Sequence, residues 1–186
     1  MKIILPFVVN TAALVAVLLT LFLTITYRIW HQGWMLTAAI STGTTAYHFL
    51  MRLAVGYLVP RLTNYDFDYR HRWFQPRPWE PDFYKKLRIK SWKKYLPTYV
   101  PAQFSMAENS LRRIIQNMCG AEVVHETIMV LCFLPLLAVP VFAEFPVFFI
   151  TSVLSALFDS LFVLAQRFNR PRLVNIYEKQ EAKAHE

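Results

Sequence analysis

The sequence is poor in glycine and cysteine, and this excludes several kinds of site. Only four glycines and two cysteines occur among 186 residues. Glycine-rich loops that cradle phosphates need several closely spaced glycines, so we expect no nucleotide-binding loop. Cys119 and Cys132 lack the spacing of metal ligands, and two cysteines do not make a disulfide framework. We interpret both as packing residues.

Charge is scarce in two long stretches of the chain and concentrated between and after them. Apolar residues make up 55% of the sequence and gather in residues 3–59 and 123–165, whereas a soluble domain is usually about 45–50% apolar. Between Pro60 and Met118 there are twelve Lys or Arg residues and five acidic ones. This segregation is typical of membrane proteins, because a charge within hydrocarbon costs several kcal/mol.

The net charge of +8 also bears on partners. Lys and Arg collect in loops that stay in the cytoplasm. Apolar segments flank the basic stretch, so anionic lipid headgroups are its nearest partners and we expect no nucleic-acid binding. Homo-oligomerisation is left open by the sequence.

The apolar stretches predict an all-α fold, an integral membrane helical bundle of about four transmembrane helices in two hairpins. Residues 3–27 contain no charge and exceed the roughly 20 residues that span a bilayer. They are too long for the apolar part of a signal peptide, which has about 7–15 residues. Residues 123–142 and 147–165 predict two further spans, and the short proline-containing link between them predicts an antiparallel hairpin.

Residues 33–59 are apolar on average but carry one polar face. Thr44, His48 and Arg52 lie within this segment. It is either a spanning helix whose polar face is buried in the bundle or an amphipathic helix at the interface; we favour the spanning helix.

The predicted organisation is a single membrane domain over residues 1–186, multi-pass in the cell membrane. Residues 60–121 form a basic, aromatic segment at the cytoplasmic interface, and residues 166–186 form a cytoplasmic tail. Two hairpins then place both termini in the cytoplasm. Within the basic segment, Ser105 with Glu108 three residues later resembles a capping box, so a helix is expected to start near Ser105.

The first candidate for chemistry is the pair Glu122 and His125. Residues three apart share one face of a helix, and a carboxylate beside an imidazole can fix its tautomer and stabilise its protonated form. Such a pair can act as a general base, although an interfacial polar patch would look the same. Glu-x-x-His also occurs in di-iron bundles, which need two such pairs and further glutamates. Only one pair is present, so we expect no metal.

The second candidate is the run Gln166-Arg167-Phe168-Asn169-Arg170-Pro171-Arg172-Leu173, directly after the last apolar stretch. Guanidinium forks match phosphate and carboxylate oxygens. A stop-transfer cluster is the alternative interpretation. The third candidate, Trp79-Glu80 through Trp92, interleaves rings and cations as an amphipathic surface helix would. Glu80 is interpreted as a salt-bridge partner or a second carboxylate of the site.

Together these three stretches resemble the glycosyl-4,4'-diaponeurosporenoate acyltransferase family of bacterial membrane proteins. The matching residues are Trp79-Glu80 through Trp92-Lys93-Lys94 and Leu96-Pro97, then Ala121-Glu122-x-x-His125, then Gln166 to Leu173. They fall in the family's order, and the resemblance covers roughly residues 70–177. It implies transfer of a fatty acyl group to a sugar hydroxyl on a long isoprenoid lipid, in staphyloxanthin-type carotenoid synthesis.

The chain departs from the pattern of that family at three positions. We expect an arginine where Gly120 stands, an aromatic residue where Glu126 stands, and an asparagine near Asp159. Two of these flank the presumed catalytic pair, where a change bears on both substrate and activity. Of what the resemblance implies, acyl transfer is better supported than the carotenoid acceptor.

The sequence hypothesis is therefore a membrane acyltransferase without a cofactor, with acyl-CoA or acyl carrier protein as donor and a glycolipid as acceptor. His125 is the expected general base and Glu122 its orienting carboxylate. The expected substrate-binding residues are Arg167, Asn169, Arg170, Arg172, Glu80, Trp79 and Trp92. The alternatives are a non-catalytic scaffold or lipid-binding subunit and, less well supported, a metal-dependent lipid oxidase.

Overall fold

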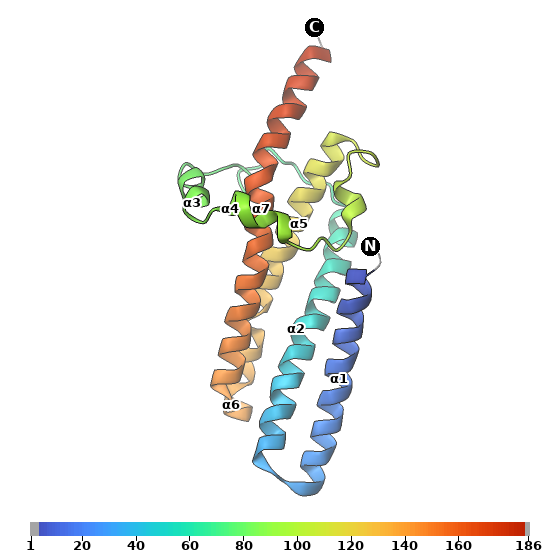
Figure 1. The fold of residues 1–186 in the computed structure, drawn as a ribbon, viewed down its shortest axis with the longest axis vertical. Helices are drawn as coiled ribbons and strands as arrows, with labels where there is room; N and C mark the ends of the chain where they lie inside the picture. Colours follow the sequence, from blue (N-terminus) through green and yellow to red (C-terminus); the bar gives the residue numbers. More distant parts are fainter. Residues whose placement is uncertain (1–3, 185–186) are drawn as a thin grey trace. The chain divides into compact units, whose positions relative to one another are not determined.

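A computed structural model describes residues 4–184, and within them every regular element is a helix. The all-α prediction is confirmed for this part of the chain. Figure 1 shows the elements in order, and their bounds are α1 Ile4–Trp30, α2 Gly33–Thr63, α3 Glu80–Lys86, α4 Ile89–Trp92, η1 Lys93–Tyr95, η2 Pro101–Phe104, α5 Leu111–Leu131, η3 Leu134–Ala138, α6 Val139–Phe142 and α7 Phe145–Ala184.

The chain divides into two compact units. The first takes in the described residues up to Tyr57 together with Thr127–Asp159, and the second takes in Leu58–Glu126 together with Ser160–Glu186 as far as it is described. The first unit holds most of the apolar sequence. The second holds the three motifs with candidate site residues.

The protein is a membrane protein by the length and composition of its helices. Three segments in the described range are long and apolar enough to cross a bilayer: Leu5–Trp30, Leu111–Phe142 and Phe145–Ala184. The predicted count of about four is therefore approximate, because α2 does not reach the same hydropathy. Phe7, Leu14 and Phe22 of α1 are mostly exposed, as lipid-facing side chains are.

Within the first unit, α1 and α2 form the predicted antiparallel hairpin (Figure 1). Ala13 and Ala16 are buried, and small side chains of this kind let helix backbones approach closely in membranes. The hydroxyl of Thr20 donates to that of Thr42 at 3.1 Å and ties the two helices together. His31, with φ of 53°, makes the tight turn between them.

The polar face of α2 is largely buried inside the first unit. Thr44 and His48 are buried, and Arg52 forms an ion pair with Asp159 of α7. Burial of the polar face within the bundle is what the spanning interpretation requires, because backbone and side-chain polar groups in hydrocarbon need partners within the protein.

Two helix boundaries differ from those predicted. The predicted start near Ser105 is wrong: Ser105 ends η2, and α5 begins at Leu111. Ser110 provides the cap, since its hydroxyl accepts from the backbone N–H of Arg113 at 3.2 Å. The predicted span 123–142 is also not one continuous helix, because α5 ends at Leu131 and short helices η3 and α6 follow. Each of these two has a proline in its first turn, a residue that cannot donate to a preceding carbonyl.

The last helix is longer than the predicted span 147–165. Helix α7 runs from Phe145 to Ala184 and includes Pro171, so the arginine motif and the described part of the expected tail, as far as Ala184, are helical. Side chains three or four residues apart on this helix therefore share a face. That periodicity determines which of the arginines point the same way.

Gly120 allows α5 to approach the loop between α2 and α3. A β-carbon at this position would lie 2.2 Å from Cδ1 of Tyr65, far inside van der Waals contact. Gly120→Ala should therefore destabilise the protein by about 1–3 kcal/mol, as other overpacking substitutions do. Gly56→Ala is the matched control, since nothing lies within 4 Å of its β-carbon position and alanine favours a helix by about 1 kcal/mol. The measurement is the thermal unfolding midpoint of both variants in lipid. A midpoint that rises in Gly120→Ala as it does in Gly56→Ala would contradict this packing.

Candidate functional site

Four charged side chains of the second unit form a continuous buried chain of ion pairs, here called the charge ladder. It runs from Glu80 of α3 to Arg167 of α7, then to Glu122 of α5 and to Arg170 of α7. Arg167 is 11% exposed at its side chain and the other three are at most 2% exposed. The ladder joins all three sequence motifs.

Arg167 is the most connected member of the ladder. Its guanidinium donates to Oε1 of Glu80 at 2.5 and 3.0 Å and to Oε1 of Glu122 at 2.7 Å. It also donates to the backbone carbonyls of Trp73 at 2.9 Å and Gln75 at 3.1 Å. One side chain thus holds α3, α5 and the loop before α3 against α7.

Arg170 completes the ladder one turn further along α7. It donates to Oε2 of Glu122 and, at 2.6 Å, to the backbone carbonyl of Phe74, and its guanidinium lies 5.1 Å from the centre of the Phe74 ring. Both carboxylate oxygens of Glu122 therefore accept from arginines. Removing such charges from water costs several kcal/mol each. In the ladder this cost is offset because carboxylates and backbone carbonyls surround both guanidinium groups.

The start of α3 presents Glu80 to Arg167. Pro81 stands in the first turn of α3, where a missing N–H is harmless, and Glu80 and Asp82 supply the negative charge that favours a helix N-terminus. The phenol of Tyr84 donates to Oε2 of Glu80 at 2.9 Å. Burial, and secondly the Glu80 carboxylate, raise the pKa of Tyr84 above its usual value, so it remains a donor.

His125 lies one turn after Glu122 on α5 and is partly buried. Its ring stacks on Phe162 of α7, with ring centres 4.5 Å apart and planes 9° apart. The next residue, Glu126, accepts a hydrogen bond from the indole N–H of Trp73 at 2.8 Å. The stack on Phe162 thus orients the imidazole, on a helix that carries Glu122 and Glu126 close by in sequence.

Asn169 is fixed from the side of the basic segment. The ammonium of Lys93 donates to its Oδ1 and lies 4.5 Å from the centre of the Phe168 ring. Burial, and secondly the charge of Arg172, lower the pKa of Lys93. With Oδ1 occupied by Lys93, the amide N–H₂ of Asn169 is the part that can donate to another group.

The remaining predicted residues lie outside the ladder. Arg172 and Trp79 are exposed, and Trp92 is partly buried, donating its indole N–H to the carbonyl of Leu87 at 2.9 Å. The structure brings the Glu122 motif into contact with the arginine motif, and Glu80 is a salt-bridge partner, one of the two roles expected for it.

Sequence reasoning missed several groups that complete the site. The backbone carbonyls of residues 73–75 carry no sequence signal. Tyr84 belongs to the third candidate stretch, but its hydrogen bond to Glu80 was not predicted, although the two residues lie four apart on a helix. The stacking of Phe162 on His125 depends on tertiary contact and could not be predicted.

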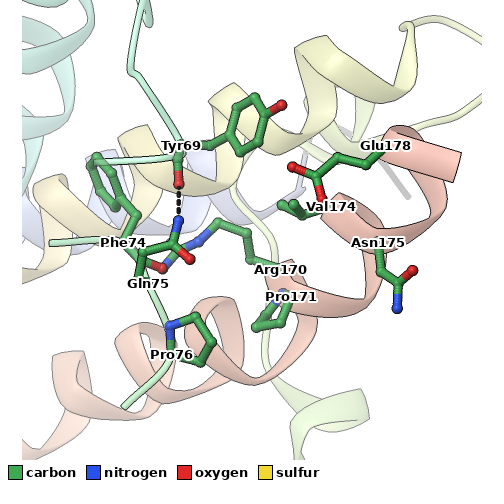
Figure 2. A pocket seen from close by; sticks show the side chains of 9 residues that line it. All are labelled: Tyr69, Phe74, Gln75, Pro76, Arg170, Pro171, Val174, Asn175 and Glu178. Atoms are coloured by element: carbon green, nitrogen blue, oxygen red, sulfur yellow. Dashed lines mark hydrogen bonds between the residues drawn. The ribbon is translucent and has the colours of Figure 1, made fainter. Parts of the chain in front are cut away.

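A pocket of about 260 Å³ lies beside the ladder, with Arg170 in its wall. Figure 2 shows rings, prolines and amides around it, and the amide of Gln75 donates to the carbonyl of Tyr69 at 3.0 Å. Its lining is Tyr69, Phe74, Gln75, Pro76, Arg170, Pro171, Val174, Asn175 and Glu178. Across residues 4–184, no group of three or more His, Cys, Asp or Glu side chains is placed to hold a metal ion.

Comparison with known proteins gives one match. The family model described as glycosyl-4,4'-diaponeurosporenoate acyltransferase matches residues 70–179. That range contains the charge ladder, His125, Asn169 and every pocket-lining residue except Tyr69. Searches among curated proteins and among solved structures found no match.

The ladder makes a stability prediction. Glu122→Ala leaves Arg170 and part of Arg167 without a carboxylate in a buried place, so the variant should lose about 3–5 kcal/mol of unfolding free energy. Asp82→Ala is the control, because the pair of Asp82 with Lys85 is exposed, with both side chains 78% accessible, and such pairs contribute about 1 kcal/mol or less. Tryptophan fluorescence during denaturation measures the unfolding free energy of both variants. Equal losses of unfolding free energy in Glu122→Ala and Asp82→Ala would contradict a stabilising role of the ladder.

Proposed function

The chain belongs to the glycosyl-4,4'-diaponeurosporenoate acyltransferase family, and we propose that it moves a fatty acyl group from a thioester donor to a hydroxyl of a glycosylated isoprenoid or other glycolipid. The observation that carries this proposal is the convergence of three distant motifs on Glu122, through Arg167 and Arg170. Membrane attachment alone would not explain why three motifs far apart in sequence form one buried network of ion pairs.

His125 is the proposed general base. It takes the proton of the acceptor hydroxyl while that oxygen attacks the carbonyl carbon of the thioester. The tetrahedral intermediate then collapses, the carbon–sulfur bond breaks, and the leaving thiolate receives the proton from His125. Phe162 sets the plane of the imidazole by stacking.

Glu122 is the proposed positioning residue. Arg167 and Arg170 fix both of its oxygens, and each carboxylate oxygen has a second lone pair for a further donor. A carboxylate held in this way can stabilise the imidazolium that forms on His125. In this proposal the two arginines act mainly through Glu122.

The negative charge that develops on the carbonyl oxygen needs a donor. Asn169 is proposed for this role, because Lys93 occupies its Oδ1 and leaves the N–H₂ group to donate. Arg172 is exposed and is the arginine best suited to donor phosphates. No cofactor is invoked, since the donor is a substrate, acyl-CoA or acyl carrier protein.

The pocket beside Arg170 is proposed to receive the polar head of the acceptor. The amides of Gln75 and Asn175 and the carboxylate of Glu178 suit the donors and acceptors of a polyhydroxyl group. Trp79, Trp92 and the lysines of the basic segment would lie at the headgroups. A soluble donor requires this face to be cytoplasmic. With two hairpins in the membrane, both termini are then proposed to be cytoplasmic as well.

The proposal is tested by lipid analysis of membranes that express the wild type, His125→Gln or His31→Asn at equal protein levels, in a host supplied with glycosylated isoprenoid lipid. We expect the acylated product to fall by at least about 100-fold in His125→Gln, the scale on which a general base contributes. His31 lies in the turn after α1, and its variant should retain full activity.

The thermal midpoint of His125→Gln should be recorded beside the lipid profile, so that loss of the fold is not mistaken for loss of the base. A correctly folded His125→Gln with undiminished product would contradict the assignment. If the wild type itself yields no acylated lipid with either donor, the chain is better described as a lipid-binding subunit.

A further inference from the structure

The first unit contains a polar cluster that shares no residue with the charge ladder. Arg52 of α2 forms an ion pair with Asp159 of α7 and donates to the hydroxyl of Ser155 at 2.7 Å. It also donates to the carbonyl of His48 at 3.0 Å. Asp159 is 1% exposed at its side chain. Ionisable residues inside apolar helices are rare and usually mark a functional site.

The contacts between α2 and the segment that starts α7 fix their register. Thr37 donates to Glu144 at 2.6 Å, and Arg52 reaches Ser155 and Asp159. As residue numbers rise along α2, those of the partner rise with them, so the helices run parallel with an offset of 103 to 107 residues. His48 is therefore level with residues 151–155, a range that includes Ser152.

His48 and Ser152 also lie on the same helix faces as the two residues of the ion pair. Ser152, Ser155 and Asp159 are spaced three and four residues apart, as are His48 and Arg52, so each set shares one helix face. Since Ser155 and Asp159 face Arg52, Ser152 faces α2 and His48 faces α7. They lie one turn from the ion pair, facing each other.

The side chains of His48 and Ser152 are buried polar groups without hydrogen-bond partners among the described residues. His48 is 6% exposed and Ser152 is fully buried. Neither ring nitrogen of His48 makes a hydrogen bond, and the hydroxyl of Ser152 makes none. Leaving such a group unpaired costs about 1–3 kcal/mol, so three unpaired atoms at one level call for a bound partner.

We propose that His48 and Ser152 form a binding site within the membrane for a hydroxyl group. A neutral imidazole offers one donor and one acceptor, and so does a serine hydroxyl. A hydroxyl ligand matches both, because it donates one hydrogen bond and accepts another.

The neighbouring ion pair excludes a charged ligand. Arg52 and Asp159 neutralise each other, so an added ion would be an uncompensated charge in an apolar unit, which costs several kcal/mol. The hydroxyl has two possible sources, an internal water or an alcohol dissolved in the bilayer. The site is independent of the acyl-transfer proposal, because none of its residues belongs to the ladder.

The experiment uses the full chain in phosphatidylcholine nanodiscs and records the thermal unfolding midpoint of the wild type, Ser152→Ala and Ser41→Ala. Ser41 is the control, since its hydroxyl donates to the carbonyl of Thr37 in its own helix at 2.8 Å. A bound hydroxyl loses a partner in Ser152→Ala, so the midpoint should fall by about 2–4 °C relative to Ser41→Ala, the shift that a hydrogen bond's worth of stability gives at this chain length.

An unchanged or raised midpoint in Ser152→Ala would overturn the proposal, because removing a truly unpaired hydroxyl relieves a cost. The source is then distinguished with a C20 isoprenoid alcohol and the hydrocarbon of the same skeleton. A midpoint of the wild type that rises with the alcohol alone, and does so less in Ser152→Ala, identifies a lipid hydroxyl. A lowered midpoint in Ser152→Ala that does not respond to the alcohol identifies water.

Discussion

The structure of the second unit depends on one interaction, the hold of Arg167 and Arg170 on the two oxygens of Glu122. These contacts join α5 to α7, and the same guanidiniums bind the carbonyls of residues 73–75 and the carboxylate of Glu80. A buried carboxylate with two arginines is costly unless all its partners are present. The ladder therefore specifies one arrangement of three segments that are far apart in sequence.

The location of the apolar helices could be predicted from the sequence, because hydropathy and charge segregation act over whole segments. The partners of individual charges could not. Arg167 and Arg170 suggested phosphate binding, yet their guanidiniums are occupied by carboxylates and backbone carbonyls of the protein. The start of α5 was also misplaced, since Ser105 and Ser110 both have the chemistry of a cap and only the local fold selects Ser110.

Gly120, Glu126 and Asp159, the three departures from the family pattern, are each accommodated by contacts within their own unit. The absent side chain of Gly120 makes room for Tyr65, Glu126 accepts from Trp73, and Asp159 pairs with Arg52. Each residue thus fits its own surroundings, and none of the three removes a member of the charge ladder.

The central claim is that His125 acts as the base in acyl transfer. Its most direct test is chemical rescue, in which purified His125→Gly is reconstituted in vesicles with an acyl thioester and a glycosylated isoprenoid lipid, and thiol release is followed with and without added imidazole. The account predicts that turnover is lost in the variant and partly restored by imidazole, with one acylated lipid formed for each thiol released. Turnover in His125→Gly equal to that of the wild type, without imidazole, would contradict it.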